Sequence, residues 1–286
     1  MEDAKEGRLY IVGTPIGNLG DLSPRALKVL RTVDFIAAED TRVTLRLLNH
    51  FGIKQTLVSY HEHNSREAGA RILRRLQAGE TAALVTDAGM PAISDPGEDL
   101  VRLCHEAGLP VESVPGPSAL ITALALSGLP TGRFCFEGFL TVSKAGRRER
   151  LRELADESRT LIFYEAPHKL LATLEDMLAA WSDREICLVR ELTKIHEEAL
   201  PTTLSAAVEK YRQTPPKGEF VLVVAGKPAE TPAAARPEDG VRIAERLLEE
   251  GLSPSAAAKE AALRTGCKKG DIYRLLIESR DGDRQA

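Results

Sequence analysis

The fold is decided by one segment near the N-terminus, Leu9–Pro24, which reads LYIVGTPIGNLGDLSP. Its first four residues are apolar and predict a short buried strand. A loop with three glycines follows. Ser23 and Pro24 then predict the start of a helix, because serine caps helix N-termini and proline has no amide hydrogen to leave unpaired at the first helical position. A strand, a glycine loop and a capped helix in this order are typical of an α/β domain.

The same rhythm continues to about residue 128. Short apolar runs alternate with amphipathic stretches, and helix caps separate them. One of these helices is expected to begin with Asp95 as its cap and Pro96 at its first position, completed by the acid Glu98. Connections of this length favour a mostly parallel sheet with helices on both faces. The predicted strands are residues 9–12, 35–38, 57–60, 82–86 and 111–114.

The character of the sequence changes after residue 128. We expect an N-terminal α/β domain at 1–128, a second α/β domain at 129–228, a linker rich in proline and alanine at 229–238, and a helical module at 239–286. The module contains three predicted short helices, and its last two resemble a helix-turn-helix, with small residues where helices meet and glycine at the turn. The alternative is a helical tail that packs against the body or against a second copy of the chain.

Charge limits the ways in which the protein can bind a polyanion. The 286 residues carry 38 Lys and Arg against 42 Asp and Glu, a formal net charge of −4. Nucleic acid would therefore need a local basic patch. Two groups of basic residues are candidates, and the alternative for each is a solvated helix face. The first is Arg147, Arg148, Arg150 and Arg152, and the second is Lys268, Lys269 and Arg274.

Cysteine spacing and hydropathy indicate a cytoplasmic protein. The four cysteines are scattered, with no Cys-x-x-Cys pair, which favours reduced thiols over a disulfide framework or a zinc site. The longest largely apolar run is residues 119–126, which Thr122 interrupts, and it is well short of the roughly 18 residues that span a bilayer. We therefore expect no export signal, no membrane association and no metal.

Glycine- and proline-rich loops follow three of the predicted strands, at residues 13–21, 86–91 and 114–119. Open α/β sheets bind ligands at the carboxyl ends of their strands, so these loops are expected to form the floor of one small-molecule site. The first loop has the spacing G-x-x-x-G-x-x-G, which differs from the dinucleotide fingerprint, and the sequence contains no Gly-Lys-Ser/Thr phosphate loop. These differences argue against nicotinamide enzymes and ATPases. A rigid turn is the alternative for any single loop.

Polar residues follow the two remaining strands, in Glu39-Asp-Thr-Arg42 and His61-Glu-His-Asn64. The two histidines could suggest a metal, but alternate residues of an extended segment point to opposite faces, which disfavours joint ligation. Substrate binding or proton transfer is the preferred interpretation, and a solvated loop is the alternative. Glu165 holds a comparable position after a strand of the second domain.

Six motifs together resemble one known family. In these segments the sequence is similar to the ribosomal RNA small subunit methyltransferase I family, a branch of the tetrapyrrole methylase superfamily. The resemblance runs from about residue 9 to residue 226, and the C-terminal module is also similar to that of longer members. The motifs are VGTPIGNLGD at 12–21, AEDTR at 38–42, SYHEHN at 59–64, TDAGMPAISDPG at 86–97, VPGPSA at 114–119 and FYEAPH at 163–168.

The resemblance implies two α/β domains with S-adenosylmethionine in the cleft between them, and a homodimer. It also implies methyl transfer to the ribose 2′-oxygen of a cytidine in the decoding region of 16S ribosomal RNA, in the small ribosomal subunit. Carried onto this sequence, it implies cofactor contacts at Pro15, Gly17, Asn18, Asp87, Ala88, Gly89, Met90, Ser118, Ala119 and Tyr164.

The chemistry of such a transfer suggests further residues. Methyl transfer from a sulfonium needs the nucleophile and the methyl group in line and shielded from water. A base that removes the hydroxyl proton typically adds roughly 10² to 10⁴ in rate. We expect the base among Glu39, His61 and Glu165, in that order. The rival functions are methylation of a small tetrapyrrole and non-catalytic binding of RNA or ribosomes. The predicted substrate contacts are Asp40, Arg42, His63, Asn64, Arg147, Arg148, Lys268 and Lys269.

Overall fold

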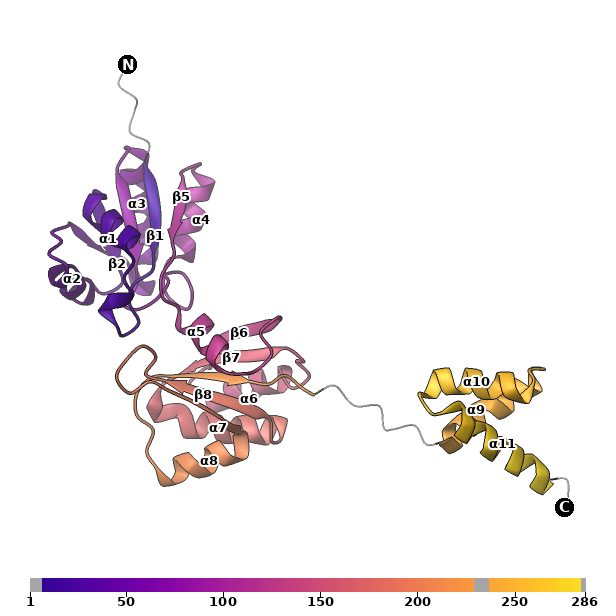
Figure 1. Ribbon diagram of the computed structural model, residues 1–286. Coiled ribbons are helices and arrows are strands. Elements are labelled where there is room, and N and C mark those ends of the chain that lie inside the picture. The colour runs from indigo at the N-terminus through magenta and orange to yellow at the C-terminus, as the bar shows by residue number, and fades with distance from the viewer. Residues whose placement is uncertain (1–6, 229–236, 284–286) are drawn as a thin grey trace. The chain divides into compact units, whose positions relative to one another are not determined.

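The computed structural model describes residues 7–228 and 237–283, which fall into two compact units (Figure 1). The first unit ends at Lys227 and contains two sheets, and the second contains three helices. Most of the predicted linker, residues 229–236, lies outside the described residues. Its last two positions, Pro237 and Glu238, are helical. The predicted division of the chain into domains stays a prediction.

The first sheet is parallel throughout, as the βα rhythm predicts. Its strand order is β3-β2-β4-β1-β5, so the middle of the sheet is made of β4 and β1 while β3 lies at one edge. A parallel sheet in this order places the loops after β1, β2 and β4 next to one another at its carboxyl edge. The strands are β1 (Arg8–Val12), β2 (Phe35–Ala38), β3 (Leu57–Ser59), β4 (Thr81–Val85) and β5 (Val111–Val114).

Helices cover both faces of this sheet. On one face, α1 and α2 bury Leu30 and Leu48 against β1 and β2, and on the other, α3 and α4 bury Ile72 and Leu100. These two apolar layers hold the sheet in place, because burial of apolar side chains is the main force that stabilises such a core. The helices are α1 (Pro24–Thr32), α2 (Thr41–His50), α3 (Ser65–Gln77) and α4 (Glu98–Glu106), with the short 3-10 turns η1 (Leu19–Asp21) and η2 (Glu62–Asn64).

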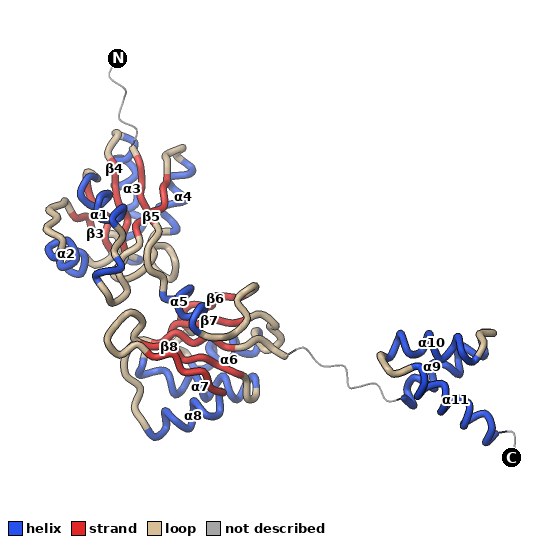
Figure 2. The backbone as a smooth tube through the Cα atoms, in the orientation of Figure 1, coloured by secondary structure: helices blue, strands red, loops and turns tan. Residues whose placement is uncertain are grey.

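The second sheet is mixed, with the order β6-β7-β10-β8-β9. Only β6 and β7 are parallel, and the remaining pairs are antiparallel. Three helices, α6, α7 and α8, pack on one face (Figure 2). The elements are β6 (Phe134–Phe139), α6 (Lys144–Glu153), β7 (Thr160–Glu165), α7 (Pro167–Trp181), β8 (Glu185–Arg190), β9 (Glu198–Thr203), α8 (Leu204–Gln213) and β10 (Phe220–Val224).

The other face of the second sheet holds α5 (Ala119–Leu126). Its residues Leu120, Ala123 and Leu124 pack against Val189 and Val221. This helix precedes residue 128, the boundary predicted between the two α/β domains, yet it packs on the second sheet. The loop after β5 therefore connects the first sheet directly to a helix of the second.

The second unit contains α9 (Pro237–Glu249), α10 (Pro254–Thr265) and α11 (Lys269–Asp283), close to the three predicted helices. Small residues let them pack closely, because Ala257, Ala258 and Ala261 of α10 are fully buried. Gly266 ends α10 in the left-handed conformation (φ 73°), as a glycine C-cap does. The expected helix-turn-helix arrangement of small residues and a turn glycine is present.

Candidate active site

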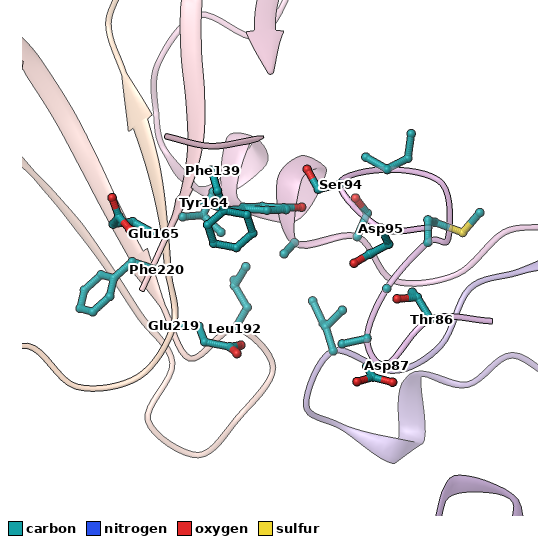
Figure 3. A pocket seen from close by; sticks show the side chains of 18 of the residues that line it. Thr86, Asp87, Ser94, Asp95, Phe139, Tyr164, Glu165, Leu192, Glu219 and Phe220 are labelled. Atoms are coloured by element: carbon teal, nitrogen blue, oxygen red, sulfur yellow. The ribbon is translucent and has the colours of Figure 1, made fainter. Parts of the chain in front are cut away.

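A cavity of about 370 Å³ lies at the carboxyl edge of the first sheet, against the second sheet (Figure 3). From the first sheet it is lined by the loop after β4 and by the start of α5. From the second it is lined by Phe139, Tyr164 and residues at the ends of β8 and β10. We call it the donor cavity. Its walls include Glu39, Asp87–Met90, Ser94, Asp95, Ser118, Ala119, Glu191, Leu192, Lys194 and Glu219.

Close backbone contacts build the floor of this region. Thr14 and Gly89 exchange two backbone hydrogen bonds, with N···O distances of 2.9 and 3.1 Å, which join the loop after β1 to the loop after β4. A Cβ on Gly116 would lie 2.8 Å from the backbone of Gly13, so only glycine lets these two loops touch. The structure thus brings together the three loops that the sequence predicts as one floor.

Backbone strain is concentrated around the donor cavity. Ala92 and Ser94, in the loop after β4, have positive φ angles of 67° and 60°. Glu191 and Thr193, in the loop after β8, have 51° and 65°. A non-glycine residue in this conformation costs on the order of 1–3 kcal/mol and persists where surrounding structure imposes it, often at functional sites. Both strained loops contribute residues to the cavity wall.

Negative charge dominates the cavity wall. Six acidic residues line it, whereas the basic residue in its lining, Lys194, is paired with Glu191 at 3.0 Å. Burial raises the pKa of the Asp87 carboxyl above its ordinary value, and the charge of Glu39 adds to this effect. A ligand with positive charge fits such a wall, because it would relieve the repulsion between neighbouring carboxylates.

Most of the predicted cofactor contacts lie in or beside this cavity. Asp87, Ala88, Gly89, Met90, Ser118, Ala119 and Tyr164 line it. Pro15 and Gly17 line a second, neighbouring cavity. Asn18 lines neither cavity; its side chain instead accepts a hydrogen bond from the amide of Gly20 (2.9 Å) and begins η1. A cofactor contact of Asn18 stays a prediction.

Glu39 is the predicted base that the structure places best. Its carboxylate accepts hydrogen bonds from the Thr86 hydroxyl (2.5 Å) and from the amide of Asp87 (3.4 Å), so it is fixed at the wall of the donor cavity. His61 is different: it lies after the edge strand β3 and belongs to neither described cavity. The strand β2 separates it from the centre of the sheet.

Glu165 lines the donor cavity, but its carboxylate is engaged elsewhere. It accepts hydrogen bonds from the Thr173 hydroxyl (2.5 Å) and the Ala166 amide (2.9 Å), and the residue is only 3% exposed. In Figure 3 it lies on the far side of Tyr164 from Asp87. These hydrogen bonds stabilise the start of α7, and a role of Glu165 as the base stays a prediction.

Asp95 is a site residue that sequence reasoning missed. The expected cap role is wrong, because α4 begins at Glu98 with Gly97 as its N-cap and no side-chain cap bond. Asp95 instead lines the donor cavity beside Thr86. Burial, and after it the charge of Glu39, raises the pKa of Asp95 from 3.8 to about 6. The sequence did not indicate this role, because the Asp-Pro-Gly-Glu pattern is also typical of a helix N-terminus.

Tyr164 and Phe139 form the aromatic part of the wall. Their ring centroids are 5.5 Å apart in an edge-to-face arrangement, and the Tyr164 hydroxyl accepts a hydrogen bond from the amide of Leu120 (3.2 Å). Burial raises the pKa of Tyr164 above its ordinary value, so the hydroxyl stays neutral. Phe139 and Glu219, at the ends of β6 and β10, belong to no sequence motif that indicated a site.

The predicted substrate contacts near the first sheet have structural partners. Asp40 caps α2 by accepting a hydrogen bond from the Arg42 amide (2.8 Å), and its carboxylate also pairs with the Arg42 guanidinium. This hydrogen-bonded pair lowers the pKa of Asp40 to about 2. Asn64 holds its loop by accepting from the His61 amide (2.9 Å), and His63 is exposed. Residues 7–228 and 237–283 contain no cluster of side chains suited to a metal ion.

The predicted arginine patch is largely neutralised within the fold. Arg147 is 8% exposed and donates two hydrogen bonds to Asp176, which Arg148 also contacts at 2.7 Å. Arg150 pairs with Glu137 and Glu153. The buried Arg147 corrects the expectation of a phosphate contact, and the guanidinium of Arg148 is already paired. In the second unit, Lys268 is exposed and Lys269 donates to the Ser255 hydroxyl (2.9 Å).

Comparison with known proteins agrees with this arrangement. The model of the tetrapyrrole (corrin/porphyrin) methylases matches residues 8–208, and a model described as the RsmI C-terminal HTH domain matches 234–280. A ribosomal RNA small subunit methyltransferase I from Synechocystis is 48% identical over 275 residues, covering 95% of this chain and 98% of the relative. The protein of that name from Escherichia coli O157:H7 is 47% identical, covering 96% of each. The chain belongs to this family.

Solved structures show the shared fold. A cobalt precorrin-4 methyltransferase is 21% identical, with a TM-score of 0.58, over 78% of this chain and 97% of the other. A uroporphyrin-III C-methyl transferase from Thermus thermophilus, complexed with S-adenosylhomocysteine, is 23% identical with a TM-score of 0.53, over 76% and 97%. No helix within the described ranges is long and apolar enough to cross a membrane.

Proposed function

We propose that this protein transfers a methyl group from S-adenosylmethionine to the ribose 2′-oxygen of a cytidine in 16S ribosomal RNA, with the small ribosomal subunit as its partner. The observation that carries this proposal is the similarity to relatives of the ribosomal RNA branch, 47% to 52% identical across nearly the whole chain. The solved precorrin and uroporphyrin methyltransferases are similar at only 21% to 23%, a level that supports the fold alone.

The donor cavity suits this cofactor. When bound, S-adenosylmethionine supplies an activated methyl group on a positively charged sulfonium. Asp87, Asp95 and Glu39 give the cavity the negative charge that attracts such a group, and Tyr164 and Phe139 add aromatic faces, which favour cations through their quadrupoles. The cavity volume, about 370 Å³, falls at the lower end of the range typical of small-molecule sites.

Glu39 has the geometry expected of the base. The Thr86 hydroxyl and the Asp87 amide fix its carboxylate, so little reorganisation is needed when it accepts the proton of the ribose hydroxyl. That proton would reside on a Glu39 carboxylate oxygen. Asp95 shares the same wall and adds negative charge beside Glu39.

We further propose that the protein works as a homodimer in the cytoplasm, as the resemblance to the family implies. The C-terminal helical unit, with exposed Lys268, is proposed to contact the ribosomal RNA, consistent with its match to a helix-turn-helix model. Sedimentation of the purified chain tests the homodimer, because a monomer at micromolar concentration would contradict it.

A methyl-transfer assay tests the function directly. Small ribosomal subunits that lack the modification are incubated with the protein and tritiated S-adenosylmethionine, and the labelled nucleoside is identified by mass spectrometry. The proposal predicts label on the ribose of one cytidine. Label on a base, or no transfer to subunits and to free 16S RNA, would contradict it.

A further inference from the structure

A second cavity lies on the other side of the turn formed by Thr86 and Asp87. It also measures about 370 Å³, and it is lined by the loop after β1 and by one side of α2. Thr86 and Asp87 line both cavities and thus form their common wall. We call the second one the acceptor cavity. Its remaining lining residues are Thr14, Pro15, Gly17, Leu19, Val43, Thr44, Arg46, Leu47 and His50.

The acceptor cavity differs from the donor cavity in charge. Apart from Asp87 in the common wall, its lining contains no acidic residue, and four of its members, Pro15, Leu19, Val43 and Leu47, are apolar. Arg46 and His50 are exposed and lie one helical turn apart on α2. Among the described residues, no carboxylate forms an ion pair with Arg46, whose Nε donates to the carbonyl of Arg42 (3.4 Å).

We propose that the acceptor cavity receives the RNA nucleoside that is methylated, with an adjacent phosphate bound by Arg46 and His50. This inference rests on the function proposed above. Proteins that act on one nucleotide of RNA generally take its base out of the stack and hold it in a pocket. The apolar wall suits the face of a base, and an unpaired arginine beside it suits a phosphate.

The common wall explains how the two substrates meet. A nucleoside in the acceptor cavity has its ribose against Thr86 and Asp87, the two residues that hold the Glu39 carboxylate through hydrogen bonds. Because Glu39 and the methyl donor lie on the donor side, the inference requires the 2′-hydroxyl to reach past this wall to both of them. Six acidic residues line the donor cavity and would repel the RNA phosphates, which keeps the polyanion on the side of Arg46.

Two variants test the acceptor cavity, each in the full chain. Val43→Trp fills it, and Val43 lies outside the apolar cluster that α2 buries through Leu48, so packing of the helix is retained. Arg46→Glu reverses the charge at its mouth. The matched control is Arg71→Glu, because Arg71 is also exposed, and it lies on α3, a helix that lines neither cavity.

We expect both variants to raise KM for unmodified small subunits by about tenfold or more, while the Kd for S-adenosylmethionine measured by calorimetry changes less than about twofold. Arg46→Glu should also make subunit binding less dependent on salt. The inference is overturned if both variants match Arg71→Glu in KM, or if the Kd for S-adenosylmethionine weakens in step with KM. Failure of the wild-type protein to methylate subunits at all contradicts the proposed function instead.

Discussion

The donor and acceptor cavities share one wall but differ in charge. The donor cavity is lined by six acidic residues and by strained loops, whereas the acceptor cavity is mainly apolar with Arg46 and His50 at its mouth. A cationic methyl donor and an anionic RNA need different surroundings, and a parallel sheet edge can provide both on the two sides of one loop. The turn at Thr86 and Asp87 therefore separates an acidic cavity from a mainly apolar one.

The largest effect is expected where the loops beneath both cavities touch. Gly116→Val would place a side chain within 2.8 Å of the Gly13 backbone. We expect the free energy of unfolding to fall by about 1–3 kcal/mol, as is typical of overpacking, together with loss of S-adenosylmethionine binding and of methylation. Urea unfolding and calorimetry measure these changes. Gly132→Val is the control, because a Cβ at Gly132 meets open space; equal behaviour of the two variants would contradict the role of this contact.

Replacement of the proposed base should come next in size. Glu39→Gln keeps the shape of the side chain and removes its negative charge. We expect the single-turnover methylation rate to fall by roughly 10² to 10⁴, whereas the Kd for S-adenosylmethionine should weaken only several-fold, through the loss of one negative charge from the cavity wall. Rapid-quench kinetics on small subunits provides the rate. Equal losses of rate and cofactor affinity, or no loss of rate, would refute Glu39 as the base.

Asp95 allows a pH test of the donor cavity. Its pKa is about 6 in the fold and 3.8 ordinarily, so the folded state holds the proton more tightly and stability falls as pH rises between these values. Asp95→Asn removes this fall in stability, because asparagine has no carboxyl proton to lose. After allowance for solvent screening, we expect the variant to be about 1 kcal/mol more stable than wild type at pH 7 and equally stable at pH 3.

The same ionisation should affect the ligand. Ionised Asp95 attracts a sulfonium, and Glu39 and Asp87 lie beside it. Affinity for S-adenosylmethionine should therefore rise several-fold between pH 5 and 7 in the wild type, on the order of the change in affinity that one added negative charge produces. Asp95→Asn should flatten this rise. Calorimetric titrations at the two pH values measure this change. If the Kd for S-adenosylmethionine changed with pH by the same factor in both proteins, the result would contradict a charged role for Asp95.

The smallest effect is expected at the arginines of α6. Arg150 is already paired with Glu137 and Glu153, so Arg150→Ala should change stability by less than about 1 kcal/mol and subunit affinity by less than twofold. Filter binding at two salt concentrations checks the affinity. A clear loss of affinity and a flatter salt dependence would restore α6 as an RNA-binding surface and weaken the contrast between the two cavities.

Much of the fold could be predicted because local signals and packing agree. Apolar runs, glycine turns and helix caps predicted the parallel sheet and the three C-terminal helices. The mixed pairing of the second sheet could not be read in this way, since β8, β9 and β10 pair through contacts that no local pattern specifies. The packing of α5 on the second sheet could not be predicted either, because the sequence of an apolar helix does not show which of two sheets it packs against.

The candidate site was only partly predictable for a related reason. Loop positions follow from strand order, so Asp87 and Glu39 could be placed at the sheet edge from the sequence. Side-chain partners are set by distant residues: Thr173 engages Glu165, and Asp176 neutralises Arg147. The role of Asp95 could not be predicted, because a helix N-cap and a cavity-lining carboxyl have the same local sequence. The backbone strain at Ser94, which the sequence does not show, distinguishes the two in the structure.

One calorimetric experiment tests the central claim, that the two cavities hold different substrates. S-adenosylmethionine is titrated into the wild type, into Ala88→Trp, which fills the donor cavity, and into Val43→Trp, which fills the acceptor cavity. We expect heat of binding for the wild type and for Val43→Trp, and none for Ala88→Trp. Binding that survives in Ala88→Trp but is lost in Val43→Trp, or no heat with any of the three, would contradict it.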